Sequence, residues 1–232
     1  ASFFTSIDKK IELLKKKHSL LEQYKKGVMQ KIFAQKIRFK DSDGNDYAEW
    51  EEKKLGEVLK IPNRIKAEYV DRNKILTVKL HLKGILKSTN TESLSIGSTN
   101  YFLRKKGQFI YGKQNLFNGA FGVIQEELDG FLSSADVPAL DIIESLVNPK
   151  FLCFYFGRKD YYRRLEAISS GSGSKRIHEK DLLKVKTILP SIEEQTKIAN
   201  FLSSIDKKIN KVQLQIDKAE EWKKGLLGRM FC

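Results

Sequence analysis

The chain has few of the residues that build metal sites and disulfide frameworks. Its 232 residues include two cysteines, three histidines and four prolines. Two cysteines, one of them the final residue Cys232, argue against a disulfide framework and indicate a reducing cytoplasm. His18, His81 and His178 are too far apart in sequence for a zinc motif. We therefore expect a cytoplasmic protein that holds no metal and no cofactor of its own.

Long apolar runs and an excess of acidic residues are also missing. No stretch approaches the roughly 18 apolar residues of a membrane-spanning helix, so we expect no membrane span. Lysine and arginine number 43 against 29 acidic residues, which gives a formal net charge of +14. In a chain of this size that excess favours nucleic acid or another polyanion as partner, although lysine-rich helices also serve solubility.

What the chain does have is one segment used twice. The sequence FFTSIDKKI at Phe3–Ile11 returns as FLSSIDKKI at Phe201–Ile209. The match resumes with EQYKKG at Glu22–Gly27 against EEWKKG at Glu220–Gly225. Copies this far apart do not stack side by side as in a solenoid, so they indicate internal pseudo-symmetry.

Both copies show the alternating three-and-four spacing of apolar residues that is typical of a coiled coil. The predicted pairing residues are Ile7, Ile11, Leu14, Leu21, Val28 and Ile32 in the first copy and Ile205, Ile209, Val212, Ile216, Ala219, Leu226 and Met230 in the second. We predict a first helix from Ser2 to Ile37 and a last helix that begins with a capping box of Ser191 and Glu194. The last helix would be about 60 Å long, so it needs a partner, and the first helix can pair with it antiparallel.

The texture changes between the helices. The hexamer Asp41–Asp46 resembles the start of a calcium loop, but an EF-hand needs glycine at its sixth position, where this chain has aspartate. A solvated turn is the better interpretation. The predicted fold class is α+β, with one mixed domain over residues 45–190 bracketed by helical regions at 1–40 and 191–232.

Period-two alternation and aromatic content predict short strands within this domain. The expected strands lie at residues 75–82, 101–103, 108–111, 121–124 and 182–189. The cationic turn Arg104–Gly107 is expected to join the second and third of them. Helical patterns cover residues 141–147, ending before Pro149, and residues 150–166, whose aromatic residues we assign to the core.

Motifs that would carry catalysis are incomplete. Asn148-Pro149-Lys150-Phe151 has lysine where the base-holding loop of an amino-methyltransferase has its second proline. Gly171–Arg176 lacks the order of a phosphate-binding loop, and Gly171-Ser172-Gly173 is too short for a nucleophile elbow. We therefore expect a chain without enzymatic activity.

Several loops carry side chains suited to DNA. One loop combines amides with a cation, and paired amides suit the adenine edge in the major groove. A serine-glycine loop ends in cations that could reach guanine or phosphate, and a third loop suits phosphates alone. The candidate DNA contacts in these loops are Arg104, Lys105, Lys106, Lys113, Gln114, Asn115, Asn118, Ser172, Ser174, Lys175 and Arg176.

A family resemblance appears where the domain ends. The string LPSIEEQTKIANFL at Leu189–Leu202 is similar to the signature that closes each target recognition domain in the specificity (S) subunits of type I restriction-modification enzymes. Trp50-Glu51 and Lys54–Glu57 resemble the entry to such a domain, and Ser133–Pro138 and Ser172–Ser174 resemble its inner landmarks. The resemblance covers essentially the whole chain.

The resemblance implies a layout, a function and partners. The family alternates two recognition domains with two helical regions that pair antiparallel, whereas this chain has one domain, so it would be a half subunit or a fragment. It implies double-stranded DNA as the target, adenine methylation by a modification subunit and cleavage by a restriction subunit. Those partner subunits would use S-adenosylmethionine, ATP and Mg²⁺.

The internal repeat predicts a further partner, a second copy of this chain. A homodimer would present two identical domains, so its methylated site would be a bipartite palindrome. Two alternatives stay open. A helix-bracketed structural protein would need no cations in its loops, and an RNA-binding protein would usually expose a platform of aromatic residues.

Overall fold

The structure is a computed structural model that describes residues 2–89, 99–171 and 173–230, with only the backbone of residues 2, 3, 229 and 230. The chain divides into two compact units. We call residues 1–46 with 197–232 the helical module and residues 47–196 the central domain. The mixed α/β architecture with long terminal helices confirms the predicted fold class.

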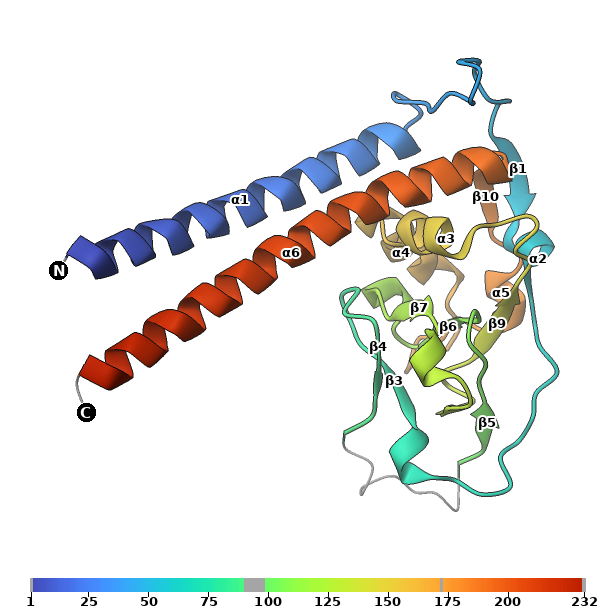
Figure 1. Ribbon diagram of the computed structural model, residues 1–232. Coiled ribbons are helices and arrows are strands. Elements are labelled where there is room, and N and C mark those ends of the chain that lie inside the picture. The colour runs from blue at the N-terminus through green and yellow to red at the C-terminus, as the bar shows by residue number, and fades with distance from the viewer. Residues whose placement is uncertain (1, 90–98, 172, 231–232) are drawn as a thin grey trace. The chain divides into compact units, whose positions relative to one another are not determined.

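The helical module contains α1 (Ser2–Phe33) and most of α6 (Ile192–Met230). The two helices lie side by side and run in opposite directions (Figure 1). Predicted pairing residues with described side chains are all buried or partly buried, among them Ile7, Ile11, Ile205 and Ile216. The helix pairing predicted from the apolar spacing is therefore confirmed.

Ion pairs across the two helices define their register. Lys25 Nζ lies 2.5 Å from Asp206 Oδ1, and Lys15 Nζ lies 2.6 Å from Glu220 Oε1. Lys223 also pairs with the carboxylate of Asp8. Partner numbers on α6 fall as those on α1 rise, as antiparallel pairing requires.

The first helix ends at Phe33, four residues before the predicted Ile37. Gln35 has a left-handed conformation with φ of 56°, and its N–H donates to the Ile32 carbonyl at 2.9 Å. The Lys36 N–H reaches back to the Lys31 carbonyl at 2.8 Å. These bonds form a Schellman motif, which is usually built on glycine. Because glutamine stands at this position, no residue type marked the end of the helix.

The turn that follows uses its aspartates internally. Asp41 Oδ1 accepts hydrogen bonds from the N–H groups of Asp43 and Asn45, both at 2.8 Å. The Asn45 N–H bond is the main reason that the pKa of Asp41 lies below its usual value. This geometry is that of an Asx turn and agrees with the interpretation as a solvated turn.

The central domain is built on a four-stranded antiparallel sheet with strand order β2-β9-β6-β7. These strands are β2 (Leu59–Lys60), β6 (Phe109–Tyr111), β7 (Phe121–Val123) and β9 (Ala139–Ile142). Antiparallel pairs surround it: β1 (Glu51–Lys54) with β10 (Lys186–Leu189), β3 (Leu76–Val78) with β4 (Ile85–Lys87), and β5 (Tyr101–Leu103) with β8 (Leu132–Ser134).

Short helices complete the domain. The α-helices are α2 (Leu55–Val58), α3 (Pro149–Phe156), α4 (Lys159–Arg164) and α5 (Glu179–Leu182). Single 3₁₀ turns are η1 (Arg72–Lys74), η2 (Leu116–Asn118), η3 (Glu126–Leu128) and η4 (Leu165–Ile168). Asn148 Oδ1 caps α3 by accepting from the N–H groups of Lys150 and Phe151, at 3.0 and 3.1 Å. Rings of the sheet and of α3 and α4 form the core, as in the contact of Phe109 with Phe156 at 4.9 Å between centroids.

Several predicted elements are wrong in type or extent. The strand predicted at 75–82 stops at Val78, because His81 and Leu82 adopt positive φ in the turn to β4. Residues 141–147 are not helical: the first two end β9, and the Ile143 N–H then donates to the Val58 carbonyl. The helix predicted at 150–166 is interrupted at residues 157 and 158, and the strand predicted at 182–189 begins only at Lys186.

The strands β5 and β6 occur where the sequence predicts them, but they do not form a hairpin. β5 pairs with β8, and β6 pairs with β7 and β9. The cationic segment 104–107 therefore connects two different sheets. The side chains of this segment differ in burial, and burial decides which of them can contact another molecule.

Polar residues at the start of α6 hold loops of the domain together. The Gln195 side chain is buried, and its Nε2 donates to the carbonyls of Pro190 and Leu146 at 2.9 and 3.1 Å. Gln195 Oε1 accepts from the Asn148 N–H at 2.9 Å. The Glu194 N–H donates to Ser191 Oγ at 3.3 Å, which is one of the two bonds of the predicted capping box. The Glu194 carboxylate accepts from the Trp50 indole.

Candidate nucleic-acid interface

Two of the predicted DNA-contacting loops meet in the structure. The Ile177 N–H donates to the Lys113 carbonyl at 2.9 Å, which brings the loop after β6 against the end of the serine-glycine loop. With its amide oxygen turned toward the donors, Gln114 accepts from Arg176 Nη2 at 3.0 Å, from Arg176 Nε at 3.2 Å and from Ser174 Oγ at 3.1 Å. Residues 62 positions apart in sequence thus form one polar cluster.

The Arg176 guanidinium is held from two sides. Besides Gln114, the carboxylate of Asp136 lies 3.7 Å from Arg176 Nε. The side chain remains partly exposed, at 42%. A planar guanidinium held along its Nε and Nη2 groups is oriented in advance, and it still carries donors on Nη1.

Arg104 supports this cluster from inside the domain. It is only 3% exposed, and its Nε donates to Ser133 Oγ at 2.7 Å while its Nη2 donates to the Val137 carbonyl at 3.2 Å. Burial lowers the pKa of Arg104 to about 10, so it stays cationic at neutral pH. These bonds fix the turn that carries Asp136. The interpretation of Arg104 as a phosphate contact does not agree with its burial, since its guanidinium is engaged by the protein.

Lys113 is also engaged within the domain. It is 9% exposed, and its Nζ lies 3.1 Å from Glu179 Oε2. Arg64 Nη2 lies 2.5 Å from the other oxygen of the same buried carboxylate. Lys113 and Arg64 together neutralise Glu179, so Lys113 has a structural role in place of the predicted contact with DNA.

The remaining predicted residues that the structure describes are exposed or partly exposed. Lys105 is exposed and forms no ion pair with any residue that the structure describes. Lys106 pairs with Glu126 at 2.6 Å and Lys175 with Glu166 at 2.7 Å, on the surface in both cases. Such pairs contribute little, so both lysines can exchange a carboxylate for a phosphate.

The two asparagines of the amide loop contact each other, with Asn118 Nδ2 3.3 Å from Asn115 Oδ1. The Asn118 carbonyl also accepts from the His81 N–H at 2.9 Å. Ser172 lies outside the described residues. The structure thus brings Gln114, Ser174 and Arg176 together and leaves Asn115 and Asn118 as part of the supporting loop.

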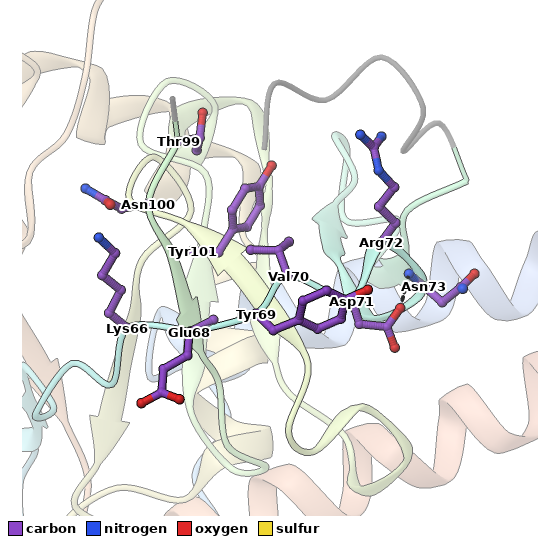
Figure 2. Close-up of a pocket in the computed structure, with 11 residues that line it drawn as sticks. Lys66, Glu68, Tyr69, Val70, Asp71, Arg72, Asn73, Thr99, Asn100 and Tyr101 are labelled. Atoms are coloured by element: carbon purple, nitrogen blue, oxygen red, sulfur yellow. Dashed lines mark hydrogen bonds between the residues drawn. The ribbon is translucent and has the colours of Figure 1, made fainter. Parts of the chain in front are cut away.

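The central domain also contains a polar cavity that was not predicted from the sequence. This cavity of about 600 Å³ is lined by residues 66–73 and 99–101. Lys66, Tyr101 and Arg72 project to one side in the close-up view, whereas Glu68 projects to the other (Figure 2). Tyr69 is 82% exposed, an unusual position for a large aromatic ring. No motif marks these residues in the sequence, and only the tertiary fold brings them together.

Two further properties concern the part of the chain that the structure describes. No group of histidine, cysteine, aspartate and glutamate side chains there is arranged to hold a metal ion. Within the same residues, no helix has both the length and the apolar character to span a membrane. Cys153 is a free thiol whose pKa burial raises to about 11.

The geometry defines a class of architecture: a mixed α/β domain with basic loops, inserted between two long helices that pair with each other. The family model described as type I restriction modification DNA specificity domain matches residues 47–218. The chain therefore belongs to the type I restriction-modification DNA specificity family. This finding confirms the resemblance seen at the end of the domain.

Individual relatives agree with the family match. The chain is 26% identical over 253 residues to the type I restriction enzyme MjaVIII specificity subunit of Methanocaldococcus jannaschii, covering 100% of this chain and 58% of that protein. It is 25% identical to the putative MjaX specificity subunit of the same organism, covering 100% and 55%. The chain thus spans a little over half the length of the curated relatives that it matches.

Solved structures show the same fold. The S subunit of a type I restriction-modification system from M. genitalium superimposes with a TM-score of 0.57 at 13% identity, covering 100% of this chain and 59% of that one. A chain from a structure of the type I R-M system gives a TM-score of 0.53 at 17% identity, covering 97% and 54%. At these identities the likeness concerns the fold alone.

Proposed function

We propose that this chain reads a specific DNA sequence as the specificity subunit, or part of one, of a type I restriction-modification complex. The observation that carries the proposal is the convergence of Gln114, Ser174 and Arg176 from two loops of the central domain. Arginine donates two parallel hydrogen bonds to the O6 and N7 atoms of guanine, the commonest specific contact in the major groove. Holding the guanidinium by Gln114 and Asp136 reduces the entropy lost when it binds.

Exposed cations supply the contacts that do not depend on sequence. Lys105, Lys106 and Lys175 are solvent-exposed, and lysines of this kind typically bind phosphates and fix the orientation of a protein on the duplex. The net charge of +14 adds long-range attraction to the DNA. Together these features favour DNA over a purely structural role.

The proposed function assigns chemistry to partners. In this proposal a modification subunit methylates adenine with S-adenosylmethionine, and a restriction subunit cleaves DNA with ATP and Mg²⁺. This chain is non-catalytic and directs both reactions to a site, in the cytoplasm where the DNA is. The paired helices space the domain along the DNA and dock the modification subunit, and a second copy of the chain completes the reader.

The test is to map methylated sites in cells that carry this chain with its modification subunit. We expect adenine methylation at one motif, and the same motif lost or relaxed with Arg176→Ala. Lys175→Ala is the matched control, since it removes a neighbouring surface cation and should keep the motif. Methylation that is independent of this chain, or an unchanged motif with Arg176→Ala, would contradict the proposal.

Purified chain alone provides a second test. Incubated with DNA and S-adenosylmethionine, it should transfer no methyl groups, because the proposal places the catalytic machinery on the modification subunit. Transfer by a preparation free of other subunits would overturn the assignment of roles.

A further inference from the structure

Two ion pairs between the helices are copies of one another. Residues 198 positions apart are equivalent in the internal repeat, so Asp8 corresponds to Asp206 and Lys25 to Lys223. The structure pairs Lys25 with Asp206 and Lys223 with Asp8. Exchanging the two copies of the repeat converts one pair into the other, so the helical module has a local two-fold axis.

These pairs are placed where they can select a register. Both lysines lie at positions that continue the apolar spacing of the helix interface, and their side chains are 24% and 31% exposed. A polar residue at such a position commonly fixes register and partner orientation in coiled coils. A shift by one turn would move each ammonium away from its carboxylate and leave it partly buried without a partner.

Each helix carries both halves of this pairing. On α1 the carboxylate and the ammonium are Asp8 and Lys25, and on α6 they are Asp206 and Lys223, with the same separation of 17 positions. Two antiparallel copies of α6 would therefore bring Lys223 of each chain against Asp206 of the other. Two copies of α1 would do the same with Asp8 and Lys25.

Apolar contacts are kept in such an arrangement. Ile205, Ile209 and Val212 have equivalents in Ile7, Ile11 and Leu14, so they meet residues of matching kind. Where α1 has the partly buried His18, α6 has Ile216. Ala219 replaces Leu21, so a gain in apolar area at one level offsets a loss at the next.

We propose that the helical module binds a second copy of this chain by exchanging helices, α6 against α6 and α1 against α1. This proposal assigns the contact surface of the homodimer that is part of the proposed function. It depends on that homodimer alone and not on how the central domain binds DNA. The exchanged pairs contain the same kind of ion pairs and a similar interface, so concentration decides between the intrachain and the exchanged form.

A charge exchange within α6 separates the two forms. The double variant Asp206→Lys with Lys223→Asp has the charge of the native chain, but it sets like charges at both contact points with α1. Two copies of the same altered α6 still form two opposite-charge pairs. We expect sedimentation equilibrium to show a dimer at least about tenfold tighter than that of the native chain.

The single variant Lys223→Asp is the matched control. Within each chain it keeps Lys25 opposite Asp206 but sets the new aspartate against Asp8, and in an α6 pair it sets aspartate against aspartate at both points. Across two chains the intrachain and the exchanged forms then have equal numbers of opposite-charge and like-charge contacts. Its dimer should therefore be about as tight as the native one. A double variant that associates no more tightly than this single variant would overturn the proposal.

Chemical cross-linking tests the proposal on the native chain, so the result does not depend on whether a variant folds. A zero-length carbodiimide joins a carboxylate to an amine only when they are in contact. Asp206 and Lys223 lie about 26 Å apart along one helix, so a peptide cross-linked between them can form only between two chains. We expect this peptide in native dimers. Dimers without this cross-linked peptide would contradict the helix exchange but not the homodimer. A chain that is monomeric at all concentrations would contradict both.

Discussion

The helical module and the central domain use their cations in different ways. In the helical module, Lys25 and Lys223 lie at the interface and each pairs with a carboxylate of the other helix at a repeated position. In the central domain, neighbouring cations have opposite roles: Arg104 is buried in the scaffold, while Lys105 is exposed. In the helices, the position of a lysine in the repeat determines whether it pairs at the interface. In the domain, contacts with loops distant in sequence determine whether a cation is buried or exposed.

Disrupting the helix interface should have the largest effect. The double substitution Ile209→Asp with Ile216→Asp places carboxylates in the apolar contact, and we expect a loss of about 5 kcal/mol or more in the free energy of unfolding. Circular dichroism during thermal unfolding measures it. Leu214→Asp is the control on the same helix, because Leu214 is 59% exposed and its replacement should cost less than about 0.5 kcal/mol. An equal loss of stability in the double variant and in the Leu214→Asp control would contradict the helix pairing.

The buried cation of the domain should come next. Arg104→Ala removes the bonds that hold residues 133–137 and leaves buried acceptors without a donor, so we expect about 3 kcal/mol of lost stability. Denaturant unfolding provides the measurement. If Arg104 were a surface phosphate contact, the variant would instead keep its stability and lose affinity for DNA.

The cluster that links two loops should affect selectivity more than stability. Arg176→Lys keeps the charge but removes the planar fork, so discrimination at one base pair should fall by about 1–3 kcal/mol. Gln114→Ala should relax the same position, because it frees the guanidinium. Competition binding with single-base-pair changes tests both variants. Effects at two different base pairs would show that Gln114 does not act through Arg176.

The smallest effect is expected at the exposed lysine. Lys105→Ala should weaken binding to all sequences alike and reduce the slope of log affinity against log salt by about 0.9, the value for one phosphate contact. Titrations at several salt concentrations measure the slope. An unchanged slope would remove Lys105 from the interface.

The sequence predicts the helical module better than the central domain. The helix pairing could be predicted because the apolar residues of α1 and α6 repeat at a fixed period within each helix. The helix end at Phe33 could not, since Gln35 adopts a conformation that usually requires glycine. Local pattern predicted the strands at 101–103 and 121–124, but not the sheet order, which depends on pairing between distant segments.

Residue types in the loops suggested DNA contacts but could not separate scaffold from surface. Lys113 is buried because Glu179 lies beside it, 66 positions away in the sequence. Arg104 is buried because of a turn about 30 positions further on. The contact of Gln114 with Arg176 likewise depends on the backbone bond between residues 113 and 177. Each of these facts requires the tertiary fold.

The spacing of the ion-pair residues has a consequence for how the chain can vary. The register of the helices is set by the 17 positions between Asp8 and Lys25 and between Asp206 and Lys223, and both distances lie within a helix. The number of residues in the central domain does not enter. Insertions or deletions there, or replacement of the whole domain by one of different length, would leave the helix alignment unchanged. The region that we propose to read DNA can therefore diverge freely while the assembly platform keeps its geometry.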